Sequence, residues 1–213
     1  SLNLIDGLIN DAGRISNEYA DKENLFDVST LKEPYRQEGK KTMGYEIAEQ
    51  FKWNLPDTIV YPTGGGTGIV GMWKAFNEMQ EMGWIDSKRP KMFAVQAVGC
   101  APIVKAFEEN TMHAELWENA STKAAGMRVP VAVGDYLILE ALRESGGGVA
   151  AIEDEDMIHT MRLIARKQGI LPAPEGAATY VGLNQLVSEG KVDKDEKILL
   201  MNTGSAFKSF ELM

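Results

Sequence analysis

Residues 61–76 read YPTGGGTGIVGMWKAF and give the clearest indication of the fold class. This stretch starts at the end of a short β-rich run, 58–61, and passes through a cluster of glycines at 64–68. It then continues as an amphipathic helix, predicted over about 69–82, with Met72, Trp73 and Phe76 on the apolar side. A strand, a tight glycine-rich loop and a helix in this order indicate an α/β unit.

The same alternation of short apolar strands and helices runs through the rest of the chain. Strands are predicted at 58–61, 92–98, 149–152 and 197–202, and the other helices at 4–19, 42–51, 102–109, 135–143, 154–168 and 177–188. This pattern predicts one parallel sheet with helices on both faces. We expect residues 1–55 to form a helical segment that leads into the core, and residues 56–213 to form the α/β domain.

Composition narrows the classes of partner. The 213 residues carry a formal charge of −9, with a pI near 4.9 and Cys100 as the single cysteine. This charge disfavours nucleic acid and anionic membranes as partners, although a small anion needs only a local basic group. One cysteine excludes a disulfide framework within the chain and fits a reducing compartment. The acidic N-terminal stretch and the lack of a long apolar run predict a cytoplasmic protein without a membrane span.

The glycine loop predicts an anion site, because it follows a strand and opens a helix whose first amides have no partner within the helix. Gly66, Gly68 and Gly71 also spell the GxGxxG pattern of dinucleotide sites. The next strand ends without the acidic residue that would bind the ribose, so NAD is the weaker interpretation. No metal site is predicted, since the acidic run at 153–156 suits the first turn of a helix.

Five segments resemble, in order and spacing, the later part of threonine synthases: EPYRQEGKKTMGYEIAEQ at 33–50, PTGGGTGIVGMWKAF at 62–76, CAPIVKAF at 100–107, APEGAATYVGL at 173–183 and MNTGS at 201–205. The glycine loop and the EGAA motif are shared by the tryptophan synthase β-like, fold type II enzymes that use pyridoxal 5′-phosphate, and the first segment points to threonine synthase. The resemblance implies the large-domain part of that fold. It also implies a homodimer that converts O-phosphohomoserine and water into threonine and phosphate.

The resemblance also assigns roles to individual residues. The cofactor phosphate would be held by the loop, which comprises Gly64, Gly65, Gly66, Thr67 and Gly68. Thr203 would meet the pyridine nitrogen, and Glu175 would lie near the cofactor. Arg36 would bind the phosphate of the substrate, a small phosphorylated amino acid, through its planar guanidinium. A surface salt bridge of Arg36 with Glu33 or Glu38 is the competing interpretation.

The chain departs from the family in one respect that concerns catalysis. The family carries its cofactor-linking lysine in a Ser-Phe-Lys-like motif upstream of the glycine loop, and this sequence contains no counterpart. Lys40 and Lys41 belong to the first resembling segment, and Lys208 lies in the C-terminal tail. We therefore expect the chain alone to be inactive. Two alternatives stay open: a related enzyme such as a threonine dehydratase or a cysteate synthase-like protein, and a non-catalytic protein that binds a phosphorylated metabolite.

Overall fold

Four parallel strands form one sheet in the order β3-β2-β1-β4 in the computed structural model, which describes residues 2–212. The strands are β1 (Thr58–Pro62), β2 (Lys91–Ala97), β3 (Gly148–Ile152) and β4 (Ile198–Leu200). In register, Thr58 of β1 faces Lys91 of β2 and Ile198 of β4. The prediction of a single parallel sheet is confirmed, although β4 is shorter than predicted.

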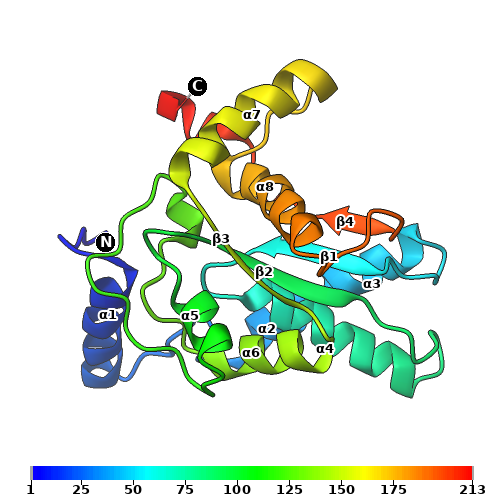
Figure 1. Ribbon diagram of the computed structural model, residues 1–213. Coiled ribbons are helices and arrows are strands. Elements are labelled where there is room, and N and C mark those ends of the chain that lie inside the picture. Colours follow the sequence, from blue (N-terminus) through cyan, green and yellow to red (C-terminus); the bar gives the residue numbers. More distant parts are fainter. Residues whose placement is uncertain (1, 213) are drawn as a thin grey trace.

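Helices cover both faces of this sheet (Figure 1). One face carries α7 (Asp154–Gln168) and α8 (Pro174–Ser188). The opposite face carries α2 (Pro34–Lys40), α3 (Thr42–Gln50), α4 (Thr67–Glu81), α5 (Pro102–Glu108) and α6 (Asp135–Glu144). Helix α1 (Ile9–Glu23) stands apart from the sheet, and three short 3₁₀ turns complete the chain: η1 (Ala125–Met127), η2 (Ala206–Lys208) and η3 (Phe210–Leu212).

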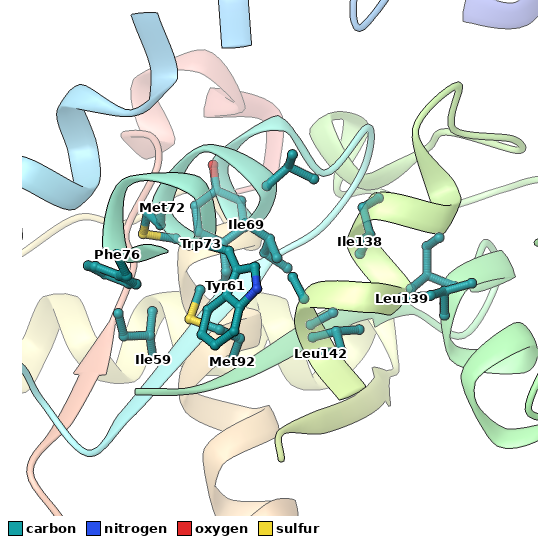
Figure 2. Packing of buried hydrophobic residues seen from close by; sticks show 14 of the residues in the cluster. Ile59, Tyr61, Ile69, Met72, Trp73, Phe76, Met92, Ile138, Leu139 and Leu142 are labelled. Carbon is teal, nitrogen blue, oxygen red and sulfur yellow. The ribbon is translucent and has the colours of Figure 1, made fainter. Parts of the chain in front are cut away.

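The strands are apolar along their length because each face of the sheet packs against its own hydrophobic cluster. Ile59 and Tyr61 of β1 point into the cluster beneath α4 and α6, whereas Val60 belongs to the cluster under α8. Figure 2 shows the first cluster, in which Met72 and Phe76 of α4 lie close to Ile59. Both side chains are fully buried, so the predicted apolar side of this helix is the one that packs on the sheet.

The N-terminal segment differs from its predicted structure. The first helix begins at Ile9 and not at residue 4, because Gly7 disfavours a helix and Asp11 Oδ2 accepts a hydrogen bond from Leu8 N at 2.9 Å to close the helix end. Its apolar side chains are largely exposed, with Ile9 62% and Tyr19 59% accessible. The amphipathic pattern therefore predicted a helix correctly, but this helix buries little against the rest of the chain.

Helix α2 was not predicted, since its sequence PYRQEGK contains no apolar repeat at helical spacing. It forms because Pro34 occupies the first turn and the Glu33 carboxylate caps it, accepting hydrogen bonds from Tyr35 N at 2.5 Å and Arg36 N at 3.1 Å.

The division of the chain into a helical segment and an α/β domain at residue 55 stays a prediction. Ser1 and Met213, the end residues of the two predicted parts, lie outside the described part of the chain. Within residues 2–212, no helix combines the length and apolar character needed to cross a bilayer.

Candidate functional site

Most of the predicted site residues, from Gly64 to Thr67 together with Glu175 and Thr203, meet at the carboxyl ends of β1 and β4, whereas Gly68 and Arg36 do not line the pocket there. From β1 the chain passes to β2 and β3 on one side, and β4 pairs on the other, which makes this the switch point where open α/β sheets bind ligands. A pocket of about 340 Å³ lies there. It is lined by Tyr61, Pro62, Gly64, Gly65, Gly66, Thr67, Ala125, Gly126, Ala173, Glu175, Thr203, Gly204, Lys208 and Ser209.

The glycine loop turns sharply, and three of its positions, Gly64, Gly66 and Gly68, leave no room for a side chain. Gly66 caps α4 with φ of 73°, in the left-handed region, and a Cβ atom there would lie 2.1 Å from Ile138 Cδ1. A Cβ atom at Gly68 would lie 2.1 Å from the Tyr61 hydroxyl oxygen. Burial raises the pKa of Tyr61, so this hydroxyl stays neutral beside the loop.

The backbone amides of the loop are available to a ligand. Along α4, the first backbone amide that donates a hydrogen bond is that of Val70, which bonds to Gly66 O at 3.1 Å. The amides of Gly65, Gly66 and Thr67 donate no hydrogen bond to any residue within 2–212. Unpartnered amides at the positive end of a 15-residue helix favour an anion.

Glu175 is held at the pocket by a segment distant in sequence. Its Oε1 accepts a hydrogen bond from Gly126 N at 2.7 Å. The carbonyl oxygen of Gly126 in turn lies against Gly64, where an added Cβ atom would be 2.3 Å away. Gly126 thus ties the first turn of α8 to the glycine loop. Thr203 reaches the same pocket because Gly204 O accepts from Ala173 N at 2.9 Å, which fixes the end of β4 against the start of α8.

Arg36 lies one side chain away from the glycine loop. Its Nη1 donates to Thr30 Oγ1 at 3.0 Å, and Thr30 Cγ2 would lie 3.5 Å from a Cβ atom placed at Gly65. The side chain of Gln37 also donates to Thr67 O at 3.2 Å, which fastens α2 to the loop. The Arg36 guanidinium makes no ion pair within the described residues.

The two carboxylates that could compete for Arg36 are used elsewhere. Glu33 caps α2. Glu38 pairs with Lys74 and, at 2.5 Å, with Lys41 Nζ. These contacts leave the Arg36 guanidinium exposed beside the loop.

Sequence reasoning assigned no role to several residues in or near the pocket, among them Thr30, Ala125, Gly126 and Lys208. Of these, Ala125 and Gly126 belong to the segment 110–128, which has no clear periodicity and for which no element was predicted. Its length was the available signal, because long loops without regular structure in compact domains are commonly functional. Lys208 was set aside because it follows the last recognised motif, although its turn folds back to the pocket.

Groups outside the pocket offer little chemistry. The Cys100 thiol is buried, and that burial raises its pKa. Asp154, from the acidic run, accepts a hydrogen bond from Lys123 N at 2.7 Å and so holds the segment before η1. In the described part of the chain, no three His, Cys, Asp or Glu side chains gather closely enough to hold a metal ion.

Comparison with known families agrees with this geometry. The model of the family described as "Pyridoxal-phosphate dependent enzyme" matches residues 2–204. The chain belongs to this family. Membership implies pyridoxal 5′-phosphate as the cofactor, and the unpartnered amides of the glycine loop fit its phosphate.

Two sequence relatives of this chain are threonine synthases. The chain is 37% identical over 187 residues to a threonine synthase of Methanocaldococcus jannaschii, which covers 88% of this chain and 46% of the relative. It is 36% identical over 204 residues to a threonine synthase of Methanosarcina acetivorans, covering 96% of this chain and 50% of the relative. The chain thus spans about half the length of these curated relatives.

Solved structures show the same fold at low sequence identity. The processed form of threonine deaminase isoform 2 from Solanum lycopersicum superposes with a TM-score of 0.76 at 19% identity, over 99% of this chain and 56% of that one. Maize serine racemase gives a TM-score of 0.70 at 16% identity, over 97% of this chain and 61% of that one. These likenesses show the fold, an α/β arrangement around a parallel sheet, as the sequence predicted.

Proposed function

We propose that this chain is the cofactor-phosphate-binding half of a threonine synthase, which converts O-phosphohomoserine and water into threonine and phosphate. The observation that carries the proposal is Arg36, which lies beside a glycine loop with unpartnered amides. The threonine synthases of two archaea, at 36 and 37% identity, support the same assignment. One phosphate would be bound by the loop and a second by Arg36.

Bound pyridoxal phosphate would supply an aromatic ring that accepts electrons from the reacting carbon of the substrate. The loop amides of Gly65, Gly66 and Thr67 would bind its phosphate. Thr203, at the end of β4, would offer a neutral hydroxyl to the pyridine nitrogen, which leaves that nitrogen largely unprotonated. Glu175 would lie near the cofactor, and the hydrogen bond from Gly126 N would hold its carboxylate in place.

Arg36 would select the substrate. Its guanidinium can bind a phosphate through two parallel hydrogen bonds, and the Thr30 hydroxyl already orients it at 3.0 Å. A dehydratase that acts on threonine or serine handles no phosphate in the substrate and gains little from this arginine. The position of Arg36 therefore favours threonine synthase over the dehydratase alternative.

We further propose that the chain alone forms no threonine. Catalysis needs an amine placed over the reacting carbon of the cofactor to within fractions of an ångström. Lys41 is engaged with Glu38 and Glu78. Among the lysines of residues 2–212, Lys208 is the one that lines the pocket, and no family motif marks it as the linking residue. Homodimer formation and a cytoplasmic location remain predictions.

Binding of O-phosphohomoserine in the presence of pyridoxal phosphate tests the substrate assignment. Isothermal titration should show that Arg36→Gln weakens this binding by about 10- to 100-fold, the loss expected for a charge-assisted hydrogen-bonding pair. Arg14→Gln is the matched control, because Arg14 lies on the exposed helix α1 and, within residues 2–212, forms its ion pair with Glu18. Equal affinities of Arg36→Gln and wild type would remove the argument for a phosphorylated substrate.

A further inference from the structure

Lys208 supplies the single positive charge among the described residues that line the pocket. It lies in the short turn η2, just after the MNTGS segment at 201–205. Its ammonium group makes no hydrogen bond or ion pair with any residue of 2–212. Most other lysines near the sheet are engaged; Lys91, for example, pairs with Glu196 at 2.6 Å. An unengaged cation at a pocket with unpartnered amides indicates an anionic ligand.

The backbone that carries Lys208 is well anchored. Ser205 forms an isolated β-bridge with Pro172, and its hydroxyl accepts a hydrogen bond from Phe207 N to cap the turn. Ala206 is fully buried against Met161 and Ala177, and its amide donates to Leu171 O at 3.1 Å. Lys208 is therefore presented from a fixed point at the pocket rim, although its long side chain is exposed.

Charge balance explains why such a cation is useful. A phosphate monoester brings close to two negative charges into a protein whose own net charge is −9. Glu175 adds a carboxylate to the pocket wall, and the loop itself offers only neutral amides. Like charges placed together raise the free energy of binding, and an ammonium nearby offsets this repulsion.

We propose that Lys208 is a ligand-binding residue that pairs ionically with the cofactor phosphate held by the glycine loop. The proposal rests on the proposed function, since it takes the loop as the phosphate site. It assigns Lys208 a non-covalent role, in which the ammonium stays protonated and forms no bond to the aldehyde. The chemistry recognised is a phosphate monoester, which either the cofactor or the substrate could supply, and the position of Lys208 at the loop pocket favours the cofactor.

Titration of pyridoxal phosphate against Lys208 variants tests this role. Lys208→Gln should weaken binding by about tenfold and flatten its dependence on salt, because one charge-assisted contact with the phosphate is lost. Lys208→Arg keeps the charge and should stay within about threefold of wild type. Lys194→Gln is the matched control, since Lys194 precedes β4 and so lies at the opposite end of the strand. Pyridoxal without phosphate should bind all four proteins alike.

Three outcomes would overturn the proposal. The first is equal affinity of wild type and Lys208→Gln for pyridoxal phosphate. The second is a loss confined to O-phosphohomoserine, which would move the contact to the substrate phosphate. The third is a reduced adduct on Lys208 after borohydride treatment, detected by mass spectrometry, which would make its role covalent. If the glycine loop is not the phosphate site, the result differs from all three, because wild-type protein would then bind neither inorganic phosphate nor the cofactor.

Discussion

Replacement of Gly66 by alanine should destabilise the chain through two separable effects. The backbone at Gly66 has φ of 73°, and holding alanine in the left-handed region costs about 1–2 kcal/mol. The new Cβ atom would also lie 2.1 Å from Ile138 Cδ1 in the fully buried core, and overpacking of this kind costs about 1–3 kcal/mol. The free energy of unfolding, measured in urea by circular dichroism, should therefore fall by about 2–5 kcal/mol.

Gly190→Ala separates these two effects, because Gly190 has φ of 71° and an added Cβ atom there meets nothing within 4 Å. It should lose only the backbone contribution of about 1–2 kcal/mol. In the double variant Gly66→Ala/Ile138→Ala the clash is removed, so the loss should be smaller than the sum of the two single losses. Equal destabilisation by Gly66→Ala and Gly190→Ala would refute the reasoning that the loop is packed against α6.

Three further predictions concern acid stability, catalysis and anions. Hydrogen bonding from Lys41 lowers the pKa of the Glu78 carboxyl, so the ionised carboxylate stabilises the fold at neutral pH and this stabilisation is lost as pH falls below about 4. The difference in unfolding midpoint between wild type and Glu78→Gln should therefore become smaller at acid pH. Chain mixed with pyridoxal phosphate and O-phosphohomoserine should release no threonine in a chromatographic assay, and any threonine formed would contradict the proposed inactivity. Crystals grown in sulfate should show an anion against the amides of Gly65 and Gly66, and density elsewhere only would count against the site.

The sheet could be predicted because buried parallel strands are continuous apolar runs, and the runs around Ile59 and Met92 are of this kind. The glycine loop could be predicted as well, since a run of glycines between a strand and a helix is typical of a turn that binds phosphate. Strand β4 was predicted six residues long, from 197 to 202, and spans Ile198–Leu200, because pairing with β1 and not local propensity sets where a short strand ends.

Contacts between distant segments could not be predicted from local patterns. Gly126 joins Glu175 to Gly64 across loops far apart in sequence, and no periodicity marks it. The apolar residues of α1 predicted a helix, yet the pattern does not say what the helix packs against, and Tyr19 is exposed. Thr30 is an ordinary loop residue until the fold brings it between Arg36 and the glycine loop.

Binding of the cofactor phosphate by the glycine loop can be tested with the variant Gly65→Ala. Position 65 can accept a methyl group, because the nearest atom to an added Cβ is Thr30 Cγ2 at 3.5 Å, so the fold should keep its stability. The methyl group would nevertheless hold a phosphate away from the loop amides. Isothermal titration should show pyridoxal phosphate binding weakened at least about tenfold in Gly65→Ala and unchanged in Gly13→Ala, whose added methyl meets nothing within 4 Å. Wild-type affinity in a stably folded Gly65→Ala protein would contradict the account.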